Sequence, residues 1–153
     1  MTDADNEAQT PDAAARSIRF AQVAGWITAG AWFAFGGWLL VDPGGLTRAF
    51  ELGDVPPVFL AELRAFYGGL ELGVGLTLAL LLGRRQFAAA TLLGAVTLLC
   101  VAAGRTLGVL VDGSNAMQYT LGSFELLGGG TNLWAYLQLP ASLRTAPADD
   151  AAR

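Results

Sequence analysis

The chain has 153 residues, of which 54% are hydrophobic and 14% are charged, and its mean hydropathy is +0.48. Soluble domains carry about 25% charged residues, so this composition excludes an ordinary soluble domain and predicts an integral membrane protein. The formal net charge of −4 and the lack of any basic patch argue against a nucleic-acid partner.

Four apolar segments have the length of about 20 residues that a helix needs to cross a bilayer. They are residues 20–41, 60–82, 87–111 and 117–139. The connections after the second and third segments are short, so these segments pack as antiparallel neighbours. We predict an all-α polytopic membrane protein with four transmembrane helices in a bundle. The alternative, a soluble four-helix bundle, requires a charged face on every helix, which these segments lack.

The first outer loop, residues 42–59, contains a short helical pattern at residues 46–52 that ends before Pro56 and Pro57. It is either a surface turn or a lid over the outer end of the bundle. The two tails, residues 1–19 and 140–153, are rich in Ala, Asp and Pro and have little to bury. We predict that both tails are disordered.

The arginines predict how the chain is oriented in the membrane. Six of them would lie on one side, at Arg16, Arg19, Arg84, Arg85, Arg144 and Arg153. The opposite loops carry only Arg48. By the positive-inside rule, both termini are expected in the cytoplasm. The protein is expected to be a multi-pass protein of the cell (plasma) membrane.

A weak internal repeat relates the first two spans to the last two. Asp42 and Asp112 follow similar Leu-Val runs, while Gly-Gly-Leu-Glu at 68–71 corresponds to Gly-Ser-Phe-Glu at 122–125. This pattern is consistent with two parallel helical hairpin repeats about an axis along the membrane normal. Chance is the alternative, because Gly, Leu and Val are abundant throughout the chain.

Two acids, Glu71 and Glu125, lie in the middle of predicted spans. A charge at that depth costs about 2.5–3.5 kcal/mol on insertion scales, so both acids are expected to face the protein interior. Helical spacing places Arg64, Gly68 and Glu71 on one face of the second span. We expect Arg105 of the third span to pair across helices with Glu71 or Glu125.

These considerations predict an intramembrane polar cluster and a set of supporting residues. The cluster consists of Arg64, Tyr67, Glu71, Arg105 and Glu125, and the supporting residues are Gly68, Gly69, Asp112, Gln118 and Asn132. The patterns Gly69-x-x-x-Gly73 and Gly104-x-x-x-Gly108 bracket Glu71 and Arg105, and small residues at this spacing let helices approach closely. The tryptophans are interpreted as interface anchors and packing residues.

The scarcity of histidine and cysteine argues against several kinds of metal, haem, redox and catalytic site. The chain has no histidine and a single cysteine, Cys100. A zinc site, a histidine-ligated haem, a dithiol pair and a Cys-His nucleophile are therefore not expected. No Walker or dinucleotide-binding fingerprint occurs, so no metal, cofactor or catalytic residue is predicted.

The run Leu63–Gly73, Val41-Asp42-Pro43 before it and residues 105–113 after it resemble a known family of small four-helix bacterial membrane proteins. That family is catalogued as domain of unknown function four-three-four-five. The resemblance covers roughly residues 20–136, and its most specific part is Arg-Ala-x-Tyr-Gly-Gly-x-Glu. It implies four transmembrane helices and no established activity. Its signature positions correspond to Arg64, Tyr67, Gly68, Gly69, Glu71, Arg105, Asp112, Gly113 and Glu125.

Three functions remain open from the sequence. The first is a non-enzymatic membrane component that binds a small or lipid-like ligand, or a partner protein, through the polar cluster. The second is a small proton-coupled transporter that uses Glu71 and Glu125, acting as a homo-oligomer. The third and least favoured is a membrane enzyme. The alternative to all three is that the cluster is purely structural and its paired Arg and Glu side chains only hold helices together.

Overall fold

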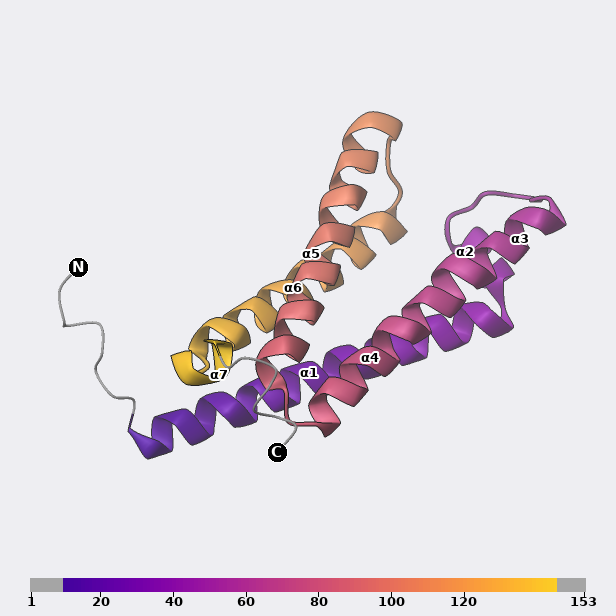
Figure 1. Ribbon diagram of the computed structural model, residues 1–153. Helices are drawn as coiled ribbons and strands as arrows, with labels where there is room; N and C mark the ends of the chain where they lie inside the picture. The colour runs from indigo at the N-terminus through magenta and orange to yellow at the C-terminus, as the bar shows by residue number, and fades with distance from the viewer. Residues whose placement is uncertain (1–9, 146–153) are drawn as a thin grey trace.

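The computed structural model describes residues 10–145, which form helices and no strands (Figure 1). A long helix α1 (Pro11–Val41) is followed by the short helix α2 (Pro43–Ala49). A continuous helix, Pro57–Gly83, then comprises α3 (Pro57–Leu63), the π-helical segment η2 (Arg64–Leu70) and α4 (Glu71–Gly83). The remaining helices are α5 (Phe87–Asp112), α6 (Ala116–Gln138) and α7 (Ala141–Thr145).

Three helices are long and apolar enough to cross a membrane: α1, the helix Pro57–Gly83, and α5. This finding supports the membrane class predicted from composition. The fourth predicted span forms a helix of 23 residues, α6, but it is not among these three. Helix α6 contains polar residues such as Gln118, Glu125 and Asn132, and these lower its mean hydropathy.

Helix α1 begins earlier than the sequence predicted. Residues 11–19 are helical and do not belong to a disordered tail. Proline is well suited to the first helical turn, Asp12 lies near the positive end of the helix dipole, and the alanines after it favour helix. At the other end, residues 141–145 form α7 within the predicted tail. The rest of both predicted tails, residues 1–9 and 146–153, lies outside the described residues.

The helices associate as two pairs that are joined at one end (Figure 1). Helix α1 packs against the helix Pro57–Gly83, and α5 packs against α6. Near its start, α1 contacts the second pair through a buried cluster that includes Ala21, Ala24, Ala135 and Leu139. Figure 1 shows the pairs diverging towards the opposite end, where the loop between α5 and α6 lies.

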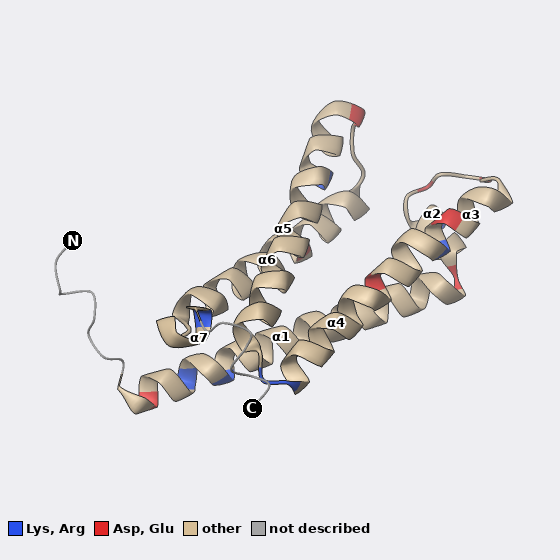
Figure 2. Cartoon of the chain, viewed as in Figure 1, with Lys and Arg blue, Asp and Glu red and all other residues tan. Residues whose placement is uncertain are grey.

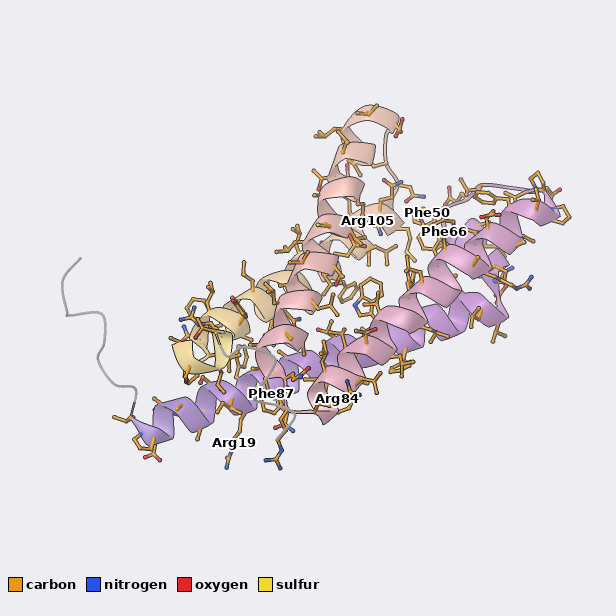
Figure 3. All side chains as sticks on the ribbon, viewed as in Figure 1. Arg19, Phe50, Phe66, Arg84, Phe87 and Arg105 are labelled. Carbon is orange, nitrogen blue, oxygen red and sulfur yellow. The ribbon has the colours of Figure 1, made fainter. Side chains whose placement is uncertain are left out.

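Charged residues are sparse along the helices and gather near their ends (Figure 2). Blue segments lie in the first half of α1, in the turn from α4 to α5, and in α7. Figure 3 places Arg19 and Arg84 at this joined end of the molecule, near Phe87. Red segments mark the far end of α5 and the region of α2 and α3.

Glycines determine how closely α1 approaches its partner helix. A Cβ atom on Gly36 would lie 2.9 Å from the backbone nitrogen of Leu72 and 3.0 Å from the carbonyl oxygen of Gly68. Conversely, a Cβ on Gly68 would lie 3.0 Å from the backbone nitrogen of Leu40. Only glycine allows backbones to pack this closely.

The glycines that we expected at the helix contacts are different ones. A Cβ on Gly73 or Gly104 would meet nothing within 4 Å, and a Cβ on Gly69 would meet only the carbonyl of Arg64, at 3.8 Å. The close contacts of α1 use Gly68 and Gly75, which share the buried face of their helix with Glu71. The small-residue motif was therefore placed on the wrong face.

Candidate functional site

A cavity of about 790 Å³ lies between the two helix pairs. Its volume is within the range of roughly 300–1,000 Å³ that is typical of small-molecule sites. The walls are mostly apolar and include side chains from α1, α2, α5 and α6, among them Ile27, Phe35, Leu98 and Phe124. Four polar or charged residues of the predicted cluster also line it, namely Tyr67, Glu71, Arg105 and Glu125. Figure 3 labels Arg105 on α5 and Phe50 near α2.

Helix α2 forms the outer part of the wall. Proline at its first position and the Asp42 side chain, which accepts a hydrogen bond from the Gly45 backbone at 3.0 Å, define its start. Asp42 also pairs with Arg48. Leu46 and Phe50 reach the cavity from this helix and its C-cap, so the short helix predicted at residues 46–52 begins earlier and lines the site.

The α5–α6 loop touches the same outer wall. The Asn115 side-chain nitrogen donates to the carbonyl oxygen of Phe50 at 3.3 Å. The Asn115 side-chain oxygen accepts from the backbone nitrogen of Gln118 at 3.2 Å, which caps the start of α6. Asn115 therefore links the second helix pair to the end of α2, beside the cavity-lining residue Phe50.

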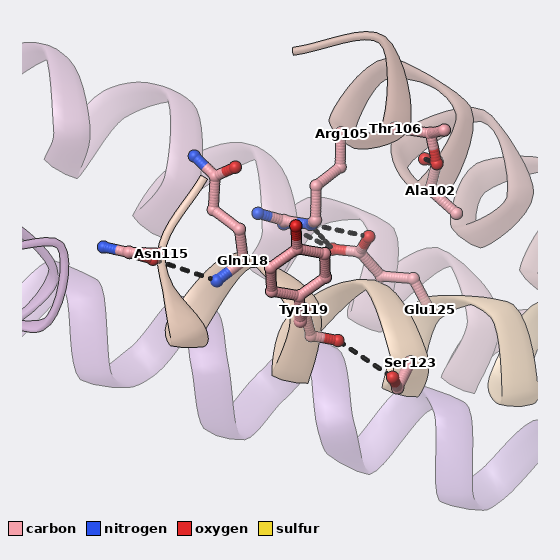
Figure 4. A network of polar contacts seen from close by, with 8 residues as sticks. All are labelled: Ala102, Arg105, Thr106, Asn115, Gln118, Tyr119, Ser123 and Glu125. Carbon is pink, nitrogen blue, oxygen red and sulfur yellow. Dashed lines mark hydrogen bonds and ion pairs between the residues drawn. The ribbon is translucent and has the colours of Figure 1, made fainter. Parts of the chain in front are cut away.

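Arg105 and Glu125 form a forked ion pair between α5 and α6 (Figure 4). Arg105 Nε donates to Glu125 Oε1 at 3.1 Å and to Oε2 at 2.9 Å, and Arg105 Nη2 donates to Oε1 at 2.5 Å. The side chains are 19% and 11% exposed. Of the two partners expected for Arg105, the structure brings Glu125 to it, and the pair neutralises both charges inside the protein.

Glu71 reaches the same cavity from the start of α4 but is not paired in this way. The residue is 9% exposed, and its Oε2 atom is buried without a hydrogen-bond partner. A Cβ on Gly36 would lie 3.1 Å from Glu71 Cβ, so the packing of α1 against α4 holds the acid in position. An unpaired polar atom inside a protein is costly, which makes this oxygen the conspicuous feature of the site.

Arg64 does not join the cluster. Its Nε donates to the carbonyl oxygen of Leu40 at 3.2 Å, where it satisfies one of the last carbonyls of α1. The prediction assumed α-helical spacing between Arg64 and Glu71. The π-helical segment η2 has more residues per turn, so that spacing does not apply, and Tyr67 of this segment faces the cavity while Arg64 does not.

Asn132 occupies the inner part of the wall and is 1% exposed. Its Nδ2 donates to Thr28 Oγ1 at 2.7 Å and to the Gly128 carbonyl at 2.8 Å, so it ties α6 to α1. Its Oδ1 lacks a hydrogen-bond partner and lies 3.0 Å from the position of a Cβ on Gly94. This oxygen therefore faces the backbone of α5.

The other supporting residues lie outside the cavity wall. Asp112 is exposed at the end of α5, and Gln118 is half-buried in the first turn of α6, where its Oε1 has no partner. Gly68 packs against Leu40, whereas a Cβ on Gly69 would meet no neighbouring helix within 4 Å.

Sequence reasoning missed the contribution of α1 to the site. Trp32 lines the cavity with its indole nitrogen buried and unpartnered, yet it was interpreted as an anchor or packing residue. Thr28, Trp32 and Phe35 follow each other at steps of four and three, so they share one helical face. Thr28 is a polar residue in an otherwise apolar helix. Its presence could have indicated that this face of α1 lines the cavity.

The arrangement combines apolar walls, one neutralised ion pair and one unpaired acid. Such a site can bind a molecule with an apolar body and a polar end. Among residues 10–145, no group of three or more His, Cys, Asp or Glu side chains is placed to hold a metal ion.

The comparisons with known proteins agree with the resemblance noted in the sequence. A family model described as Domain of unknown function (DUF4345) matches residues 20–136, a range that contains every residue lining the cavity. No match was found among curated proteins or among solved structures. Because the family model covers more than half of the chain, the protein belongs to the family of the domain of unknown function DUF4345.

Proposed function

We propose that this protein is a non-enzymatic, four-span component of the bacterial cell membrane that binds a small or lipid-like amphiphile in the cavity between its helix pairs. The observation that carries the proposal is the unpartnered Oε2 of Glu71 in the wall of an otherwise mostly apolar cavity. The polar end of a ligand would pair with the Glu71 carboxyl group, while its chain would cover apolar residues such as Ile27, Leu98 and Phe124.

A fourth span and cytoplasmic termini are part of this proposal. Helix α6 packs along α5, and its one acid, Glu125, is neutralised by Arg105, which lowers the cost of placing α6 in lipid. The arginines in the first half of α1 and in the turn from α4 to α5 lie at the same end of the molecule (Figures 2 and 3). The positive-inside rule assigns that end to the cytoplasm.

A purely structural cluster would be expected to balance its charges. The Arg105–Glu125 pair does so, and it helps to hold α5 against α6. Glu71 makes no hydrogen bond or ion pair with either residue, yet it remains buried. Leaving a buried acceptor unsatisfied costs about 1–3 kcal/mol, so a role in binding explains why the acid is tolerated there.

The proposal is tested by tryptophan quenching in detergent micelles. Brominated forms of a fatty alcohol, a fatty acid and a fatty amine are titrated separately, because Trp32 and Trp38 line the cavity and bromine quenches tryptophan on contact. Saturable quenching by at least one probe is expected. Ala31→Phe, which fills the cavity, should abolish it, whereas Ala103→Phe on the exposed surface of α5 should not. Equal, non-saturable quenching in all three proteins would mean bulk detergent contact and would refute the proposal.

Proton-coupled transport is the second candidate, and the observation that favours it is the Glu71 carboxyl group, which lines the cavity and has no ion-pair partner among the described residues. Vesicles reconstituted with the protein and loaded with a pH-sensitive dye would show proton flux under a pH gradient. A flux that disappears in Glu71→Gln would support transport. A flux no greater than that of empty vesicles would leave ligand binding as the function.

A further inference from the structure

Some of the side chains that line the cavity are also exposed on the outside of the molecule. They form one row on α1 and one on α6, with the helical spacing of three and four residues. The rows are Ile27, Ala31 and Ala34 on α1, and Phe124, Leu127 and Thr131 on α6. Ile27 and Leu127 are 68% and 69% exposed. A side chain that lines a cavity and is still mostly exposed lies at its rim, so the cavity is open along both rows.

Each row lies on the side of its helix that is turned away from the partner helix. Ile27 is nine residues, or two and a half turns, from Gly36, which packs against the backbone of α4. On α6, a Cβ on Gly129 would lie 3.2 Å from the backbone nitrogen of Leu99 in α5, and Leu127 is more than half a turn away from this contact.

The two rows face each other across a gap between α1 and α6. Helices α4 and α5 contact each other on one side of the cavity, through a buried cluster that includes Leu78, Leu82 and Ala90. Because each row points away from α4 or α5, both rows lie on the other side of the cavity. We call the gap between the two rows the α1–α6 slot.

The slot is closed at its inner end and extends towards the outer end. Thr28 and Asn132, which are hydrogen-bonded at 2.7 Å, directly adjoin the two rows. From that level each row runs outwards over seven residues, or about 10 Å. On the α4–α5 side, only Tyr67 and Val101 are exposed among the described residues that line the cavity. The longer open rim is therefore the α1–α6 slot.

The position of the slot along the helices determines what surrounds it. Its rows lie near the middle of the predicted spans 20–41 and 117–139, and neither row contains a charged residue. At that depth the surroundings of a membrane protein are hydrocarbon chains. The charged residues Glu71, Arg105 and Glu125 lie further inside, in the cavity wall.

From these observations, and resting on the proposed function with α6 as a fourth span, we infer that the cavity takes its ligand sideways from the bilayer through the α1–α6 slot. The ligand is then a membrane lipid. One of its acyl chains lies in the slot between the rows of Ile27 and Leu127, in contact with apolar side chains on both sides. A molecule that enters from water would have no use for an apolar opening at this depth.

The inference is tested by photocrosslinking in vesicles of phosphatidylethanolamine and phosphatidylglycerol. A trace of the phosphatidylethanolamine carries a diazirine in the middle of one acyl chain, and mass spectrometry identifies the modified residues. Adducts are expected on Leu98, a half-buried residue of the α5 wall, and on Val96, an exposed α5 residue outside the cavity that any surrounding lipid reaches. Adducts on Val96 with none on Leu98 would overturn the inference.

A reversible block shows whether the lipid passes through the slot. In a Cys100→Ser background, Ala34→Cys receives a nitroxide label through a disulfide bond, which places a bulky group in the slot. The label should remove the Leu98 adducts and keep those on Val96, and reduction should restore them, which a folding defect would not allow. The same label on Ala103→Cys, on the exposed surface of α5, should change neither. Leu98 adducts that persist in labelled Ala34→Cys would show that lipid enters elsewhere and would overturn the inference.

Further outcomes separate this inference from the proposed function. Saturable quenching by a probe in micelles, without lipid adducts on Leu98 in vesicles, would overturn entry from the bilayer and leave ligand binding in place. Failure of both measurements would refute both proposals. If Ile27→Cys joins two copies of the chain through a disulfide and Leu98 stays unmodified, a second copy covers the slot and the inference is wrong.

Discussion

Arg105 and Glu125 depend on each other for their place inside the protein. Replacing Arg105 with leucine leaves the Glu125 carboxylate buried and uncompensated, and breaking such a pair typically costs about 3–5 kcal/mol. We expect Arg105→Leu to lower the unfolding free energy by about that amount, measured by titrating a denaturing detergent into mild micelles. The double variant Arg105→Leu with Glu125→Leu should recover most of the loss, because no isolated charge remains. A double variant that is as unstable as the sum of the single ones would contradict this view.

Asn132 is the second residue whose side chain joins helices. Asn132→Ala removes its hydrogen bond to Thr28 and should destabilise the protein by about 1–2 kcal/mol, whereas Leu133→Ala, at an exposed neighbouring position, should have a smaller effect. Thermal unfolding in micelles measures both. A double-mutant cycle with Thr28→Val isolates the contact, since removing Asn132 also leaves a void. A coupling energy near zero would show that the bond contributes nothing.

At the level of single residues, the sequence indicated which charges lie inside but not how they pair. Glu71, Arg105 and Glu125 were expected inside because lipid cannot satisfy them, and the structure brings all three to one cavity. The prediction that Arg64 joins the cluster was wrong because residues 64–70 form a π-helical segment. Such a segment depends on tertiary packing and has no clear signature in the spacing of residues. Trp32 was missed because a tryptophan in an apolar helix can serve as packing or as a hydrogen-bond donor, and the sequence does not distinguish the two.

Among the elements, the contact between α1 and the helix Pro57–Gly83 depends on single glycines. Gly36→Ala would place a methyl group 2.9 Å from the Leu72 backbone nitrogen and force the two helices apart. We expect it to cost about 1–3 kcal/mol, as overpacking does. Gly37→Ala is the matched control, because a Cβ there meets nothing within 4 Å and alanine favours helix. The denaturing-detergent titration compares them, and equal stabilities for the two variants would disprove the role of Gly36.

The helix boundaries show what hydropathy can and cannot predict. The predicted second, third and fourth segments correspond closely to helices in the structure, since their length and composition leave few alternatives. The start of α1 at Pro11 was missed because its first turns are not apolar, although alanine and an N-terminal proline favour helix. The faces of the helices were harder to assign, because glycines occur on several sides of each one and only packing selects among them.

Over the whole molecule, the two helix pairs are packed together at the joined end and separated by the cavity at the other. Buried clusters unite the pairs around Ala21 and Leu139 and around Leu82 and Ala90. The outer cluster around Leu39 contains residues of α1, α2 and α3 but none of α5 or α6. At this end, the Asn115 side chain of the α5–α6 loop donates a hydrogen bond to the Phe50 carbonyl oxygen after α2. The pairs therefore separate at the end where no buried cluster joins them, and this separation leaves room for a ligand.

The number of membrane crossings follows from whether α6 spans the bilayer with its partner α5. If it does, the loop at Ser114 lies outside and Ser142 lies in the cytoplasm; with only three crossings, both lie on the same side. The test uses Cys100→Ser as background and single cysteines at the exposed positions Asp54, Ser114 and Ser142, treated with a membrane-impermeant maleimide on intact cells. We expect Asp54→Cys and Ser114→Cys to react at once and Ser142→Cys only after permeabilisation. Reaction of Ser142→Cys in intact cells together with Ser114→Cys would show that α6 does not cross, because no other described helix after α5 is long enough to return the chain.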